Sequence, residues 1–206
     1  MMKATSLLTL TLTLAAALVA RAQMTTFAAQ PSGSKVKIDG TSTIHDWTIE
    51  GGIIAGTLEL DSSFVADPTK AKPGKVPAKV EITIPVRTLK SGKTTMDNVT
   101  YQAMSQTNFP RIHYILSELT LKETPKSADG PYNFDSKGQL VIKGTTNAVS
   151  FPVTMTRSGK ALRTMGVYKL KMTDYKVPPP APSLLGLSIK TGDQVTLTWD
   201  WATQQK

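Results

Sequence analysis

The feature that most constrains this chain is an alternation of apolar and polar residues that recurs along much of its length. Such alternation, with a period of two, places the apolar side chains on one face of a β-strand. About eight segments with this pattern, separated by turn residues, predict an all-β chain that forms an antiparallel barrel or sandwich. The pattern is clearest at Val76, Ala78, Val80, Ile82, Ile84 and Val86.

One stretch, residues 89–112, breaks the alternation and predicts a short helical insertion near residues 94–106. Thr94 or Thr95 is expected to begin the helix, with Asp97 near the positive end of its dipole. The sequence 108–110, Asn-Phe-Pro, is expected to end it, because a residue before proline disfavours the helical conformation. The apolar residues that would share one face of this helix are Met96, Val99, Ala103 and Met104.

The first 22 residues have the pattern of a Sec-type signal peptide. Lys3 supplies a positive charge, residues 7–19 are mostly apolar, and residues 20–22 read Ala-Arg-Ala, a small-x-small cleavage site. The apolar run is shorter than the roughly 20 residues that span a membrane. We therefore expect cleavage before Gln23, a single domain over residues 23–206, and a soluble periplasmic protein.

Composition narrows the functional class. The chain has no cysteine, which excludes disulfides, thiolate metal sites and covalent haem. Its formal charge is +9, and removal of Lys3 and Arg21 with the signal leaves 22 basic and 15 acidic residues, or +7. The basic residues are scattered and form no basic-aromatic motif, so we expect a solvated surface and no nucleic-acid partner. A transient attraction to anionic membrane surfaces is the sharper alternative.

No catalytic or metal-binding motif is present. The chain has two histidines, His45 and His113, and neither belongs to a spacing typical of metalloenzymes. No nucleophile elbow or phosphate-binding loop occurs. We therefore expect a binding protein with no catalytic residues, metal or cofactor. An enzyme acting on a bound lipid would have to use His45 with Asp46 or Asp174.

Six segments, in this order along the chain, resemble the YceI-like family of bacterial periplasmic lipid-binding proteins. They are residues 41–47 (TSTIHDW), 86–97, 108–112, 138–146, 170–175 and 189–195. The resemblance implies an extended antiparallel eight-stranded lipocalin-like β-barrel. It also implies that the lumen holds a long polyisoprenoid tail, such as that of a quinone or a prenyl phosphate. The chain departs from simpler members at residues 67–77 and 178–182. If these segments lay at the barrel mouth, they would either alter head-group preference or close the pocket.

An apolar wall of alternating residues suits such a tail, because each buried methylene contributes about 0.8 kcal/mol. Methionines would let this wall adapt to a flexible chain. In a strand His45 and Trp47 would share a face, either near a head group or as structural core residues. The predicted ligand-binding residues are His45, Trp47, Ile82, Ile84, Met96, Val99, Met104, Phe109, Tyr114, Phe151 and Met172.

The main alternative is a structural or partner-binding barrel filled by its own side chains, because it would show the same alternation. A homodimer is also compatible with the sequence. An outer-membrane barrel is disfavoured, because lysines occur in most predicted strands and aromatic residues make up only 6% of the chain.

Overall fold

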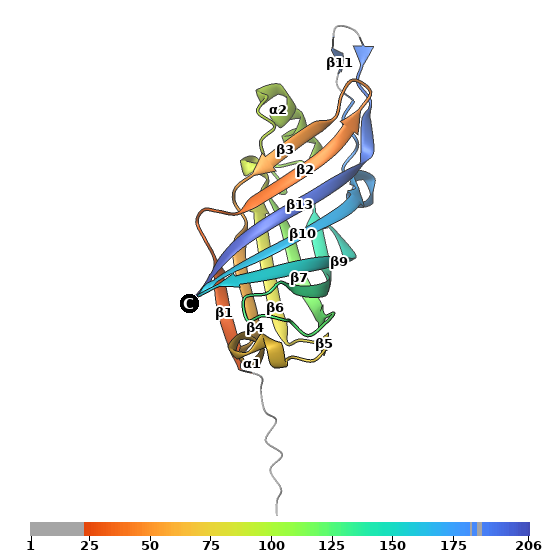
Figure 1. The fold of residues 1–206 in the computed structure, drawn as a ribbon. Coiled ribbons are helices and arrows are strands. Elements are labelled where there is room, and N and C mark those ends of the chain that lie inside the picture. Colours follow the sequence, from red (N-terminus) through yellow and green to blue (C-terminus); the bar gives the residue numbers. More distant parts are fainter. Residues whose placement is uncertain (1–22, 182, 185–186) are drawn as a thin grey trace, which may run out of the picture.

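The computed structural model describes residues 23–181, 183–184 and 187–206, so the predicted signal peptide, residues 1–22, lies outside the described residues. Figure 1 shows a tall barrel of strands with helical segments at both ends. The strands are β1 (Met24–Ala29), β2 (Lys35–Ser42), β3 (Trp47–Gly51), β4 (Ala55–Asp61), β5 (Gly74–Lys75), β6 (Ala78–Pro85), β7 (Arg111–Leu121), β8 (Tyr132–Ile142), β9 (Thr145–Ser158), β10 (Ala161–Lys171), β11 (Ser183–Leu184), β12 (Leu187–Ser188) and β13 (Thr191–Gln205).

Eight of these strands close into an antiparallel barrel, as the sequence predicted. Their order is β1-β4-β6-β7-β8-β9-β10-β13, and β13 then pairs with β1. Closure leaves no free edge along these pairings, which removes the surface through which sheets aggregate. The long pairing of β10 with β13, from Ala161–Gln204 to Lys171–Gln194, runs almost the full height of the barrel.

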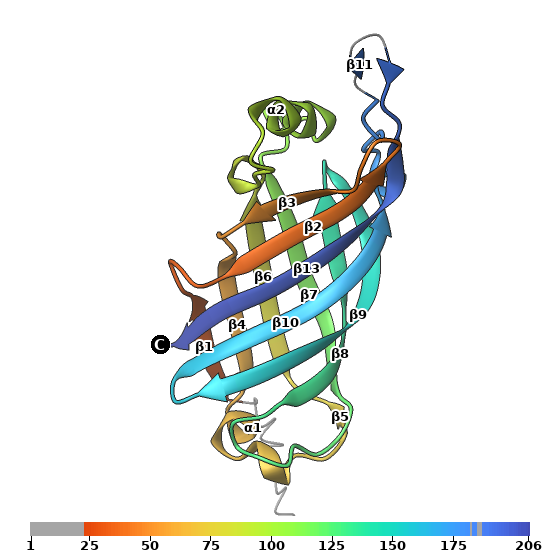
Figure 2. The same ribbon diagram turned by 45° about the horizontal axis from the view of Figure 1, so that its top comes forward.

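The upper part of the wall is completed by β2 and β3. The carboxyl end of β13 pairs with β1, whereas its preceding part, from Thr191 to Asp200, pairs with β2. β3 pairs with β2, and its far side meets Lys90 through reciprocal Glu50–Lys90 backbone hydrogen bonds of 2.8 and 2.7 Å. Figure 2 shows that β2 and β3 extend the wall above β1 and β4.

The predicted helical insertion is α2 (Thr94–Ala103), at the upper end of the barrel (Figure 1). It begins after Lys93, and neither Thr94 nor Thr95 caps it. It ends before the predicted boundary, because Ser105 adopts a left-handed conformation with φ of 49° and turns replace the helix up to residue 108. No helix within the described part of the chain is long and apolar enough to cross a membrane.

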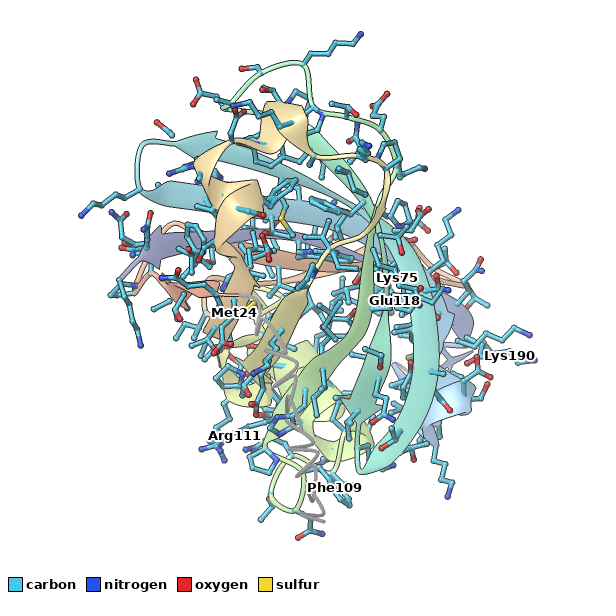
Figure 3. The ribbon with its side chains drawn as sticks, turned by 90° about the horizontal axis from the view of Figure 1, so that it is seen from below. Met24, Lys75, Phe109, Arg111, Glu118 and Lys190 are labelled. Atoms are coloured by element: carbon cyan, nitrogen blue, oxygen red, sulfur yellow. The ribbon has the colours of Figure 1, made fainter. Side chains whose placement is uncertain are left out.

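A second helix, α1 (Ser62–Ala66), was not predicted; it lies at the opposite end beside the 3-10 helix η1 (Pro68–Lys70). The Asp61 carboxylate caps α1 by accepting hydrogen bonds from the backbone N–H groups of Ser63 and Phe64, at 2.8 and 3.1 Å. The segment 67–77 therefore lies at this lower end and not at the mouth. In Figure 3, viewed from below, its Lys75 lies beside Glu118 of β7.

Packed side chains fill the lower end of the barrel. Phe64 of α1 stacks against Tyr132 and Phe134 of β8, with ring centroids 5.4 and 5.6 Å apart. Trp201 of β13 is 1% exposed, and its indole N–H donates to the Ile54 carbonyl at 3.0 Å. Trp201 therefore lies in the packed core. Close packing in the lower half therefore stabilises the barrel, although its upper half is less filled.

Hairpin turns bring several strand ends to the upper rim. The turn between β8 and β9 consists of Lys143 and Gly144, with φ of 49° and 73°, and Ile142 faces Thr145 across it. The turn has only two residues, because β9 already begins at Thr145. The short pair β11–β12 rises at the same end (Figure 2).

Candidate ligand-binding site

The upper half of the barrel encloses a cavity of about 610 Å³. Ligand pockets in proteins typically measure about 300–1,000 Å³, so its size suits an organic ligand. Exposed residues belong to its lining, which shows that the cavity opens to solvent at the upper end. Its walls are aliphatic and come mainly from β2, β3, β6, β7, β10 and β13, including Val36, Ile38, Ile49, Ile84, Leu170 and Leu197.

Helix α2 covers part of this cavity with the apolar face that the sequence predicted. Met96, Val99, Ala103 and Met104 all belong to the lining, where their half-buried side chains face the lumen. The two methionines bring long, unbranched and polarisable side chains to the cavity, which can adjust to a flexible ligand.

Hydrogen bonds made by Asp97 and Tyr101, in the first and second turns of α2, hold the helix in place. The Asp97 carboxylate accepts from the backbone N–H and the hydroxyl of Ser91, at 2.7 and 2.8 Å. This hydrogen bonding from Ser91 lowers the pKa of the Asp97 carboxyl. The Tyr101 hydroxyl lies 3.1 and 3.0 Å from the carbonyls of Arg87 and Leu89. The helix is thus attached to the segment that follows β6.

The motif at residues 41–47 forms the turn between β2 and β3 at the mouth. Its Trp47 ring lies across Gly40 of the neighbouring strand, where an added Cβ would stand 2.1 Å from the indole. The indole N–H donates to the Thr41 carbonyl at 3.0 Å. A side chain at residue 40 would force the ring out of the cavity wall, so this glycine and this tryptophan act as one structural unit.

His45 and Lys93 bring ionisable nitrogen groups to a mainly apolar lining. Both are exposed at the mouth, beside the hydroxyl-bearing Ser42 and Thr95. Nδ1 of His45 lies 2.7 Å from the Asp46 backbone carbonyl, so it donates there and leaves Nε2 for another partner. Among the described residues the lining contains no carboxylate, which makes this mouth suitable for a neutral or anionic polar group.

Tyr175 brings a phenol to the lining of the upper cavity. It belongs to the 3-10 helix η3 (Met172–Tyr175), which follows β10, and its side chain is buried. Burial raises the pKa of Tyr175 to about 12, so the phenol is neutral under physiological conditions. It therefore adds a polar but uncharged group to the wall.

A second cavity of about 80 Å³ lies below the first. Ile84, Ile112 and Leu197 line both cavities and therefore form the neck between them. Beneath the neck, the Phe151 ring contacts Tyr114, Tyr168 and Trp199 at centroid distances of 5.3, 5.4 and 5.0 Å. This aromatic cluster narrows the lumen, so the barrel is hollow above and nearly filled below.

The structure distributes the predicted ligand-binding residues over both cavities. The upper cavity is lined by His45, Trp47, Ile84, Met96, Val99, Met104 and Met172. Ile82, Tyr114 and Phe151 line the lower one, and the Tyr114 hydroxyl lies 2.7 Å from that of Ser136. Phe109 lines neither cavity. The prediction was wrong in placing it inside, because its ring lies outside over Gly144 in the β8–β9 turn and is 37% exposed.

Sequence reasoning missed several lining residues. Ile38, Leu170, Val195 and Leu197 carry the same alternating signal as the residues that were selected, and strand register alone would have found them. Ile44, Lys93 and Val177 lie in turns and connections, where no periodicity shows which way a side chain points.

In the described part of the chain, His45 makes no ion pair with Asp46 or Asp174, and its Nδ1 lies 2.7 Å from the Asp46 backbone carbonyl. Within the described residues, no three histidine, aspartate or glutamate side chains converge as metal ligands would.

Fold and cavity together define a lipocalin-like β-barrel with an apolar chamber open at one end. Residues 24–202 match the YceI-like domain, and the chain belongs to that family. Among solved structures it is similar to BcnA of Burkholderia cenocepacia, with 18% identity, a TM-score of 0.61, and coverage of 82% of this chain and 95% of that one.

Two further structures share the fold. A polyisoprenoid binding domain from Saccharophagus degradans, described as implicated in plant cell wall breakdown, is 9% identical with a TM-score of 0.61, and the match covers 87% of this chain and 98% of that domain. The YceI protein of Campylobacter jejuni is 15% identical with a TM-score of 0.55, at coverages of 75% and 82%. No curated protein sequence matches the chain.

Proposed function

We propose that this protein carries or sequesters an amphiphilic lipid with a long apolar tail, such as a polyisoprenoid, inside the upper chamber. The strongest support is an apolar chamber of about 610 Å³. It opens to solvent at its upper end, where α2 covers part of the opening. A filled structural barrel would leave no such space. The description of the Saccharophagus degradans domain as polyisoprenoid binding points to the same ligand class.

Burial of the tail would provide the binding energy. Each methylene removed from water contributes about 0.8 kcal/mol, so a tail of ten buried carbons gains roughly 8 kcal/mol before ordering costs. The wall donates few hydrogen bonds, so it would select the tail by shape and length and not by polar contacts. Branched isoprene units suit a wall of isoleucine, valine, leucine and methionine.

The polar head would lie at the mouth, beside His45 and Lys93. Nε2 of His45 and the ammonium of Lys93 can meet either a quinone carbonyl or a prenyl phosphate, the two head groups that we propose. The proline run at residues 178–182 borders this region through Pro180, which lines the cavity. The proposed periplasmic location rests on the signal peptide predicted for residues 1–22.

The proposal is tested by extracting protein exported into a bacterial periplasm and purified without detergent. Mass spectrometry of the extract should find an isoprenoid at close to one molecule per chain. A clean extract from folded protein that also takes up no added quinone or prenyl phosphate would overturn the carrier proposal.

A matched pair of variants assigns the lipid to the chamber. Val99→Trp adds a large ring to the half-buried face of α2 and should abolish lipid retention. Val167→Trp makes the same change on the outer face of β10, where Val167 is 50% exposed, and should leave retention unchanged. Circular dichroism would verify that both variants are folded.

A further inference from the structure

An exposed isoleucine in the turn between β2 and β3 also lines the cavity. Ile44 is 56% exposed, yet it also belongs to the lining of the upper chamber. Isolated apolar residues on a protein surface are common and need no explanation. Ile44 differs from them because its side chain is exposed and also lines the chamber, so outer and inner apolar surface meet at this residue.

The turn holds Ile44 in this position through several hydrogen bonds. The Ser42 hydroxyl accepts from the backbone N–H groups of Ile44 and His45, at 3.3 and 3.2 Å, and donates to the His45 carbonyl at 2.7 Å. Thr43 is joined to Lys190 through backbone and side-chain hydrogen bonds of 2.9 and 3.2 Å. These hydrogen bonds therefore fix the position of Ile44 next to the beginning of β13.

Phe109 lies on the opposite side of the mouth. It packs on the β8–β9 turn, and β8 lies across the barrel from β2 in the strand order. Figure 3 shows Phe109 with Arg111 at one part of the outer edge and Lys190 at another. Each exposed apolar residue of the rim thus has a basic neighbour, since Lys190 adjoins the Ile44 turn.

Basic residues outnumber acidic ones around the mouth. We define the mouth rim as residues 42–46, 86–111, 143–144, 171–177 and 189–193. Its basic residues are Arg87, Lys90, Lys93, Arg111, Lys143, Lys171, Lys176 and Lys190, and its carboxylates are Asp46, Asp97, Asp174 and Asp193.

Two of the four carboxylates are already engaged within the protein. Ser91 and Lys90 surround Asp97, and Thr173 donates to Asp193 from its backbone N–H and its hydroxyl at 2.9 and 2.6 Å. Lys93 and Lys190 make no ion pair with any carboxylate in the described part of the chain. Their charges remain available to an external anion.

We propose that the mouth rim docks on an anionic lipid bilayer, with Ile44 inserted among the acyl chains and Lys93 and Lys190 against the phosphates. A bilayer fits these observations because it offers an apolar layer directly beneath a negatively charged surface. Docking in this orientation faces the open end of the chamber toward the membrane. A tail could then pass between bilayer and chamber along Ile44 with little exposure to water.

Sedimentation with vesicles tests the docking surface. The chain from Gln23 is used, because it contains every barrel strand and lacks the apolar segment at residues 7–19 that would bind vesicles by itself. Delipidated protein should bind phosphatidylglycerol vesicles and not phosphatidylcholine vesicles, and salt should weaken the binding. Because no bound tail is needed, failure here would leave the carrier proposal intact.

Charge-reversal pairs locate the surface. Lys93→Glu with Lys190→Glu should weaken partitioning at least about 25-fold, since each rim lysine near an anionic surface contributes about 5-fold. Lys72→Glu with Lys126→Glu changes the net charge equally but lies in exposed loops at the closed end, and should have little effect. Equal losses from both pairs would mean diffuse attraction and would overturn the proposal.

A fluorescent label tests insertion directly. The chain has no cysteine, so Ile44→Cys and Val167→Cys each create a single labelling position for a polarity-sensitive dye. The label at residue 44 should shift to the blue with anionic vesicles, and the label at residue 167 should not. A concentration-dependent shift without vesicles would instead identify a second copy as the partner of the rim, and an absent shift would exclude insertion.

Discussion

At the scale of single residues, close contacts between glycine and aromatic rings shape the inner wall. Gly40 makes room for Trp47, Gly166 for Trp199, and an added Cβ at residue 166 would stand 2.2 Å from the ring of Trp199. Both pairs are direct cross-strand neighbours. The barrel thus accommodates large rings in its wall without closing the chamber.

The substitution Gly40→Ala should therefore destabilise the protein by about 1–3 kcal/mol, the usual cost of forcing extra atoms into a packed site. The added methyl would displace Trp47, which lines the chamber, so lipid retention should fall as well. Urea denaturation measures the first effect. Gly52→Ala is the matched control, because its nearest neighbour would be the Ser34 carbonyl at an ordinary 3.8 Å. Equal stability of both variants would contradict this role of Gly40.

At the scale of elements, the start of α2 is stabilised by the Asp97 carboxylate, which accepts hydrogen bonds from Ser91, six residues earlier. Asp97→Ala removes both hydrogen bonds to Ser91, and hydrogen bonds to charged groups contribute about 1.5–3 kcal/mol each. We expect the helix to open more easily by about 2 kcal/mol, so that amides at residues 98–103 exchange roughly 30-fold faster. Hydrogen exchange with mass spectrometry measures this. The exposed neighbour gives the control Asn98→Ala, which should leave exchange nearly unchanged.

Three strands are linked by Glu118, which lies next to the irregularity in β7. Its carboxylate lies 2.6 Å from the Lys75 ammonium on β5 and 2.9 Å from that of Lys137 on β8. These two hydrogen bonds lower the pKa of the Glu118 carboxyl from 4.5 to about 2. A lowered folded-state pKa stabilises the protein above the unfolded value, and this contribution is lost as pH falls from about 4.5 to about 2.

Glu118→Gln should therefore reduce the loss of stability between pH 6 and pH 3, measured as the shift of the urea midpoint. The effect should be small and should shrink at high salt, since both partners are exposed lysines. Glu81→Gln is the control, because Glu81 is exposed on β6 and makes no ion pair within the described residues. An unchanged acid dependence in Glu118→Gln would show that this triad does not affect folding.

At the scale of the whole molecule, the alternating strands and the family motifs were sufficient to predict the barrel and α2. The hollow upper chamber was not predictable, because the same alternation describes a wall around empty space and a wall around packed side chains. The position of Phe109 was not predictable, because it lies in a turn, where no periodic pattern shows which way a side chain points. Helix α1 was missed because a five-residue segment is shorter than the window in which helical periodicity can be recognised.

The division of the lumen leads to a prediction about tail length, which depends on the carrier proposal. Leu197 of β13 lies across the barrel from Ile84 and Ile112, and these three residues separate the chamber of about 610 Å³ from the space of about 80 Å³ below. Leu197→Ala should join the two and shift the extracted lipids toward longer chains, at a cost of about 2–5 kcal/mol in stability. Leu116→Ala is the control, because it removes the same atoms from a residue that lines only the lower cavity. It should leave the length of the extracted lipids unchanged. Mass spectrometry of the lipids from both variants decides the matter, because an unaltered length distribution in Leu197→Ala would mean that the tail stops above the neck for another reason.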